Sequence, residues 1–155
     1  MKNILASILL AGIVALSSCS KSNGPATPKG ETAEFTFTVA VPAGAPNGIT
    51  IAIGGVDPTN TKNTNLWKVN GVAQGSQIAV ALDGSYFPAG KTTTVTIESQ
   101  VPLIDVNVDF SLLVFNPPYV VTYTPVINGA TVQGDALSNF SVTGTLDKNF
   151  AYNQQ

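Results

Sequence analysis

Residues 104–114 read I-D-V-N-V-D-F-S-L-L-V, and apolar and polar side chains alternate along most of this stretch. Every second residue is apolar, so an extended strand here would have one wholly apolar face. A period of two is typical of a β-strand that buries one face. Asp105 and Asp109 would lie on the opposite, solvated face. The stretch therefore predicts a strand, and Pro117-Pro118 is expected to end it.

The same alternation recurs on both sides of this strand, with turn residues between the runs. The apolar residues that mark these runs are Phe35, Phe37, Val39 and Val41; Ile49, Ile51 and Ile53; Leu66 and Val69; Ile78, Val80 and Leu82; Val95 and Ile97; Tyr119, Val121 and Tyr123; Phe140 and Val142. Asn70-Gly71, Asp83-Gly84 and Asn128-Gly129 are two-residue hairpin signals. We predict an all-β fold over residues 34–155, an antiparallel two-layer β-sandwich of about eight strands.

The composition excludes most catalytic chemistry. The chain has no His and no Arg, and Cys19 is its single Cys, so Ser-His-Asp and Cys-His arrangements are impossible. Asp105 and Asp109 could form a glycosidase pair, but along one strand they would lie about 13 Å apart, which is too far. We expect a protein that is not an enzyme and has no cofactor.

The segment 57–65, D-P-T-N-T-K-N-T-N, is rich in oxygen ligands but has one carboxylate and one lysine. Asp105-Val106-Asn107-Val108-Asp109 imitates the start of a calcium loop, but the sixth position is Phe110 where Gly is needed. We therefore expect a solvated loop at 57–65, a strand at 105–109 and no metal site.

The N-terminus resembles the signal peptide of bacterial lipoproteins. Lys2 gives a positive start, residues 4–16 form an uncharged apolar run too short to span a bilayer, and Leu16-Ser17-Ser18-Cys19 resembles a lipobox. The resemblance implies cleavage after residue 18 and lipidation of Cys19, whose acyl chains would anchor the protein. Ser20 in place of Asp resembles the sorting pattern for the outer membrane, on its periplasmic or cell-surface side.

Residues 19–33 are small, polar and broken by Pro25 and Pro28, so we expect a flexible tether between the anchor and the domain. Removal of the signal peptide leaves six lysines against nine acids, a net charge of −3. A mildly acidic chain without Arg is a poor partner for nucleic acid, and we expect none.

Trp67, Tyr86 and Tyr119 are candidate ligand-binding residues, because aromatic rings could form a platform for a sugar. The alternative for Trp67 is a place in the core. Residues 35–54, with Val41-Pro42-Ala43-Gly44 at their centre, resemble the opening of starch-binding β-sandwich modules.

That resemblance implies a carbohydrate-module-like sandwich, and an immunoglobulin-like one fits the strand pattern equally well. The expected function is a non-catalytic binding module with a glycan ligand. The alternative is a structural or adhesion subunit that binds another envelope protein through β-strand edges.

Overall fold

The computed structural model describes residues 29–46 and 48–152, so the predicted signal peptide at 1–18, Cys19 and most of the predicted tether at 19–33 lie outside the described residues. The described strands are β1 (Ala33–Val41), β2 (Ile49–Val56), β3 (Trp67–Val69), β4 (Val72–Ala73), β5 (Ala79–Asp83), β6 (Lys91–Ser99), β7 (Ile104–Ile127), β8 (Ala130–Thr131) and β9 (Leu137–Tyr152). All pairings between these strands are antiparallel, which confirms the predicted all-β class. Among the described residues, no helix has the length and apolar character needed to cross a membrane.

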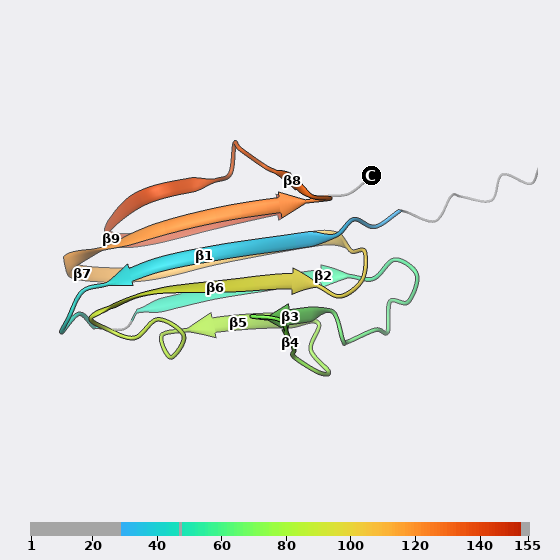
Figure 1. The fold of residues 1–155 in the computed structure, drawn as a ribbon, viewed down its shortest axis with the longest axis horizontal. Coiled ribbons are helices and arrows are strands. Elements are labelled where there is room, and N and C mark those ends of the chain that lie inside the picture. The colour runs from blue at the N-terminus through green and yellow to red at the C-terminus, as the bar shows by residue number, and fades with distance from the viewer. Residues whose placement is uncertain (1–28, 47, 153–155) are drawn as a thin grey trace, which may run out of the picture.

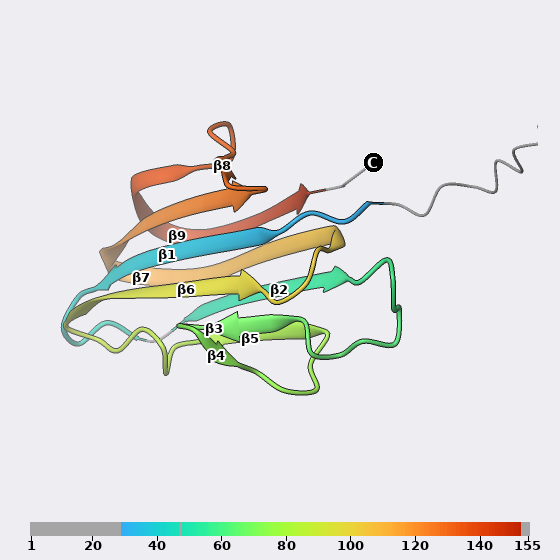
Figure 2. The same cartoon turned by 45° about the vertical axis from the view of Figure 1, so that its right-hand side comes forward.

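The strands form one continuous sheet, curled into a half-barrel (Figures 1 and 2). Its order is β4-β3-β6-β1-β7-β2-β5, with β8 and β9 paired to β7. The first part of β7 pairs with β2 and its last part pairs with β1, while β9 follows it on the other side along both parts. We call the part of the sheet that contains β1 and the last part of β7 the β1 half. The part that contains β2 and the first part of β7 is the β2 half.

The prediction that Pro117-Pro118 ends the strand is wrong, because β7 continues through both prolines to Ile127. The pairing between β7 and β9 is interrupted between Val114 and Tyr119. The prolines lie in this gap, where a missing N–H removes no ladder hydrogen bond to β9. Figure 1 shows β7 turning back at this point, so the prolines mark a bend within one strand.

Gly144 marks the corresponding bend in β9. It pairs with Val114, the last paired residue before the gap, and its φ of +83° lies in the left-handed region. Glycine adopts this conformation without the steric cost that a Cβ brings. The two long strands therefore bend together, and this bend brings the β1 half over the β2 half.

The core lies between the two halves. Alternate residues of β1 are buried, as predicted from the period of two. Phe37 of β1 lies 5.5 Å, centroid to centroid, from the ring of Phe110 in the first part of β7. Phe35 is 5.5 Å from the ring of Tyr152 at the end of β9. Apolar side chains from both halves thus pack on one another, and their removal from water stabilises the curl.

The turn predictions have mixed outcomes. Asn70-Gly71 joins β3 to β4 and Asn128-Gly129 joins β7 to β8, and all four residues have positive φ, as a two-residue hairpin requires. Asp83-Gly84 ends β5 but forms no hairpin, because β5 pairs with β2 whereas β6 pairs with β1 and β3. Local sequence marks the end of β5 but does not decide its partner.

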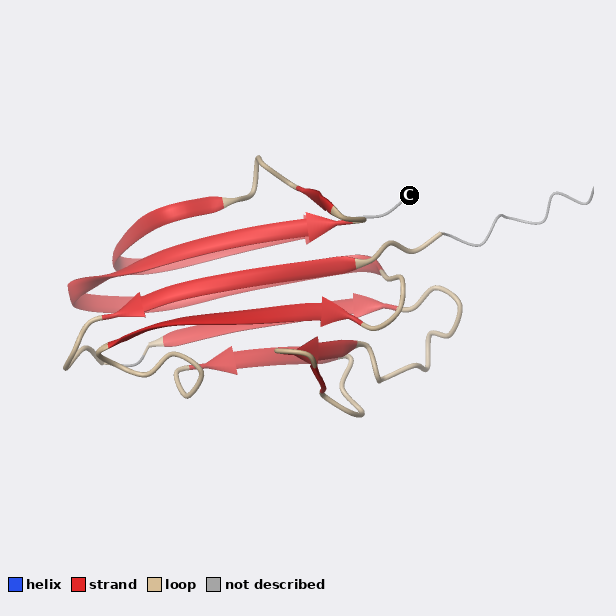
Figure 3. Ribbon diagram, viewed as in Figure 1, coloured by secondary structure: helices blue, strands red, loops and turns tan. Residues whose placement is uncertain are grey.

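The ordered domain begins before residue 34, the predicted boundary. Glu31 and Leu103 exchange two backbone hydrogen bonds of 2.9 and 2.8 Å, and β1 starts at Ala33. The loops gather at two ends of the sheet (Figure 3). The end near Ala33 is the one at which the described residues begin.

Candidate functional site

The structure does not bring Trp67, Tyr86 and Tyr119 together. Trp67 pairs with Ser99 near the Ala33 end of β1, while Tyr119 lies one residue beyond the pair of Val120 with Ala40. The intervening length of β1 spans about 25 Å. The expectation of a common aromatic platform is therefore not supported by the positions of these rings.

Trp67 and Tyr119 are also fully buried, which corrects the expectation that they are exposed to a ligand. The Trp67 Nε1–H donates to the Ile78 carbonyl oxygen at 3.2 Å, and its ring lies 6.3 Å from that of Phe35. The Tyr119 hydroxyl donates to the Pro46 carbonyl. Both residues serve the core, which was the alternative weighed for Trp67.

Tyr86 is partly buried and packs against the core from the turn that follows β5. Its backbone N–H donates to the Asp83 carbonyl at 3.1 Å. The hydroxyl and backbone N–H of Ser85 donate to the Asp83 carboxylate and lower the pKa of that group. These bonds fix a tight turn at the Val41 end of the sheet, where Tyr86 and the buried Phe87 follow one another.

Asp57 organises the loop that was weighed as a metal site. Its Oδ1 accepts the Thr59 hydroxyl at 2.7 Å and the backbone N–H groups of Thr59 and Asn60 at 2.8 and 3.1 Å. Its Oδ2 accepts the Asn63 side-chain amide at 2.9 Å. These hydrogen bonds, that of Asn63 foremost, lower the Asp57 pKa to about 2. Both oxygens are thus used within the loop.

The same loop borders a hollow at the tether end of the domain. This hollow of about 530 Å³ is lined by Lys29, Gly30, Asp57, Pro58, Thr59, Val101 and Pro102. Across residues 29–46 and 48–152, no group of three or more potential ligands among His, Cys, Asp and Glu could hold a metal ion.

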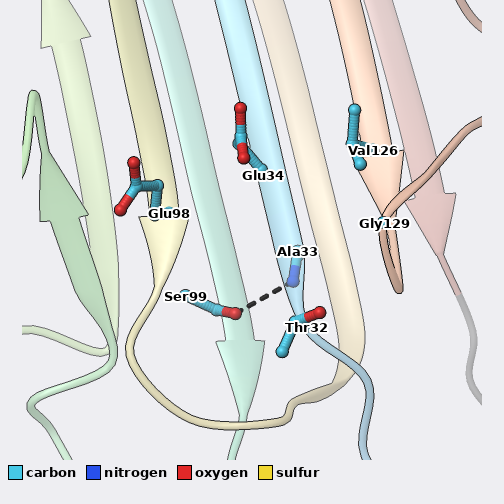
Figure 4. A pocket seen from close by; sticks show the side chains of 7 residues that line it. All are labelled: Thr32, Ala33, Glu34, Glu98, Ser99, Val126 and Gly129. Atoms are coloured by element: carbon cyan, nitrogen blue, oxygen red, sulfur yellow. Dashed lines mark hydrogen bonds between the residues drawn. The ribbon is translucent and has the colours of Figure 1, made fainter.

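Glu34 of β1 and Glu98 of β6 are acids that the pairing register places side by side. Both side chains lie on the outer side of the sheet. They border a hollow of about 240 Å³ together with Thr32, Ala33, Ser99, Val126 and Gly129 (Figure 4). The Ser99 hydroxyl accepts the Ala33 N–H at 2.9 Å at its lower rim. The register between β1 and β6 places the two acids side by side, and the sequence alone does not reveal that register.

Threonines cover the outer face of the β1 half between this hollow and the Val41 end. Two rows run across β7, β1 and β6 in register, one of Thr124, Thr36 and Thr96 and one of Thr122, Thr38 and Thr94. We call these six residues the threonine face. The sequence did not predict this face, because its rows cross three strands that are distant in sequence.

The second edge of β9 carries no strand in the described part of the chain. β9 pairs with β7 alone, although it is 16 residues long. Phe140 on this strand is 40% exposed, and the Lys148 ammonium lies 5.8 Å from the centre of its ring. The free edge therefore combines unpaired backbone groups with an exposed ring.

No model of a known protein family matches this chain, and no curated protein and no solved structure matches it either.

Proposed function

We propose that the protein is a lipid-anchored, non-catalytic binding subunit of the outer membrane that recognises another envelope protein through the free edge of β9. The length of that edge carries the proposal. Strands of globular proteins are usually about 3–10 residues long, and exposed edges are usually kept short. β9 has 16 residues and one strand neighbour among the described residues. A partner strand added there would gain main-chain hydrogen bonds along the edge.

The segment at residues 145–152 is the best docking edge. It runs in unbroken register against β7, from Thr145 opposite Leu113 to Tyr152 opposite Val106. The rest of β9 is interrupted by the bend at Gly144 and by positive φ at Asn139. Such interruptions protect an edge from unwanted pairing. A heterologous strand is therefore expected to pair with 145–152.

Two adjacent proline variants test this edge. Neighbouring residues of a strand direct their N–H groups to opposite edges, so one of the variants Lys148→Pro and Asn149→Pro removes a backbone donor from the free edge, and the other removes one that faces β7. The Asn149 side chain also donates to Asp109 on β7, so Asn149→Ala measures the cost of losing that bond. With this cost subtracted, the less destabilised proline variant identifies the residue whose N–H lies on the free edge. A photo-crosslinking residue placed at Ala151 is expected to give a specific adduct in native membranes, and this proline variant should abolish it. The same crosslinker at Thr50 of β2 is the control, and an adduct that survives the proline would contradict the proposal.

Lipidation of Cys19 is the second part of the proposal, and it rests on the lipobox resemblance at 16–19. It predicts incorporation of a palmitate analogue and recovery in the outer-membrane fraction. Cys19→Ser should lose both. A protein that stays unlabelled and soluble would refute the anchor without affecting the test of the β9 edge.

A glycan is the second candidate ligand, and the threonine face favours it. Six hydroxyl-bearing side chains lie on one outer face of the sheet, where they could bond to sugar hydroxyls. We also propose that the fold is a two-layer sandwich similar to that of carbohydrate-binding modules. The contacts between the β1 half and the β2 half support it.

A further inference from the structure

The threonine face is a regular grid of hydroxyl groups. Neighbouring strands lie about 4.8 Å apart, and alternate residues of one strand lie about 6.7 Å apart. The pairing registers place Thr36 between Thr124 and Thr96, and Thr38 between Thr122 and Thr94. Each row therefore presents three threonine residues at the strand spacing.

These hydroxyls have spare hydrogen-bonding capacity. The Thr38 and Thr94 hydroxyls bond to each other at 2.8 Å. The Thr122 hydroxyl accepts the backbone N–H of Asn139 at 3.2 Å and donates to the Asn139 Oδ1 at 3.5 Å. A hydroxyl can donate once and accept twice, so even these three can take another partner. All six threonines are half-buried or exposed.

The grid carries no charge, whereas the regions around it do. The nearest charged row, Glu34 with Glu98 and Lys68, lies beyond the grid toward the Ala33 end. The outer face of the β2 half has acids instead, including Asp109 and Asp147. An uncharged ligand matches the threonine face, because an ionic ligand would find no counter-charge there.

An apolar strip borders the grid on its other side. The next row toward the Val41 end contains Val120, Ala40 and Thr92, which contribute to a shallow hollow of about 310 Å³. Pro42, Pro118 and the exposed Lys91 also line it, so one cation lies at this border of the grid. Hydroxyl groups beside a small apolar strip complement a sugar ring, which has polar edges and C–H faces.

We propose that the threonine face binds an extended, uncharged polysaccharide that lies across β7, β1 and β6. The strand spacing of about 4.8 Å is comparable to the length of one hexopyranose unit, so each sugar of a stretched chain meets one strand. Each row then accommodates three consecutive sugars. This inference specifies the ligand of the glycan candidate and rests on that candidate, while it is independent of the β9 edge.

Affinity electrophoresis in gels containing hydroxyethylcellulose tests the proposal, with polygalacturonate as the anionic comparison. The probe variant is the triple change Thr36→Val, Thr96→Val and Thr124→Val, which removes one row of hydroxyls at nearly constant shape. Thr50→Val, on the outer face of the β2 half, is the matched control. We expect the neutral polymer to retard the wild type and the control equally, and the triple variant to bind about tenfold more weakly.

The unfolding midpoint of each variant distinguishes a loss of binding from a loss of folding. If the triple variant does not fold, Thr36→Lys replaces it, because the lysine side chain blocks the grid with a single change. Equal retardation of the triple variant and wild type would overturn the inference and leave the glycan candidate standing. Stronger retention by polygalacturonate would overturn the uncharged ligand. No retention by either polymer would overturn both the inference and the glycan candidate. If the protein then adsorbed to ice, the ligand of the grid would be ordered water.

Discussion

The hydroxyl oxygens of Tyr123 on β7 and Tyr152 on β9 lie 2.8 Å apart inside the core. Tyr123 is fully buried and Tyr152 is the last residue of the last strand, so the bond attaches the end of β9 to the β1 half. Burial raises the pKa of both hydroxyls, and the nearby Asp135 carboxylate raises them further. The pair is a polar link inside an aromatic cluster.

Tyr152→Phe should therefore destabilise the fold, because it leaves the buried Tyr123 hydroxyl without a partner. A cost of about 1–3 kcal/mol is expected. Tyr123→Phe should cost less, since Tyr152 is 7% exposed whereas Tyr123 is fully buried. Urea denaturation of both single variants and the double variant measures the coupling. Additive effects of the two changes would contradict a direct interaction.

Alkaline pH should unfold the protein through the same pair. The ordinary tyrosine pKa is 10.0, and it is raised for both groups in the folded state. The folded state holds these protons above pH 10 while the unfolded chain releases them, so stability present below pH 10 falls as the pH rises above it. Urea midpoints measured across this range check the prediction. The double variant Tyr123→Phe with Tyr152→Phe should show a smaller fall in stability above pH 10.

Acid should weaken the 57–65 loop. The Asp57 pKa is lowered from 3.8 to about 2 by its hydrogen bonds from Asn63 and Thr59. The stabilisation that the ionised Asp57 carboxylate provides is complete above pH 3.8. It is lost as the pH falls toward 2, because the protonated carboxyl no longer accepts these hydrogen bonds. Thermal melts between pH 2 and pH 6 measure the loss. Asn63→Ala, which removes the largest cause of the shift, should flatten the curve, and an unchanged curve would contradict this role.

Removing one charge of the Glu34–Glu98 pair should stabilise the protein. Glu98 of β6 also pairs with Lys68 on the neighbouring strand β3. Glu34→Gln therefore relieves the repulsion between the two glutamates and leaves the attraction between Glu98 and Lys68 in place. We expect a gain of about 0.5 kcal/mol, larger at low salt than at high salt. Glu31→Gln, in the bridge to Leu103, is the control. A loss of stability in Glu34→Gln at low salt would show that the carboxylates are not in repulsive contact.

Gly144→Ala should disturb the bend of β9. The residue has a φ of +83°, and no atom lies within 4 Å of the position its Cβ would take. The expected cost of about 1 kcal/mol is therefore conformational and not steric. Gly134→Ala is a matched control, because its surroundings are equally open and its φ is not positive. Equal urea midpoints for the two variants would contradict the role of Gly144.

The sequence by itself determined the buried face of β1, whereas Ile78 and Phe140, which mark other predicted runs, are exposed. Phe35, Phe37, Val39 and Val41 alternate with polar or small residues, and the structure buries all four. Two of the three hairpin signals also hold. These features depend on local chemistry, since side-chain alternation and turn geometry are set within a few residues.

Only the tertiary structure decided which strands meet. Pairing between β1 and β6 creates the Glu34–Glu98 pair, and pairing of β7 with both β1 and β2 turns a predicted strand end into a bend. Two of the aromatic candidates, Trp67 and Tyr119, are core residues for the same reason, because their burial depends on neighbours distant in sequence. Long-range register is a cooperative property of the folded sheet, and the alternation of one strand does not encode its partner.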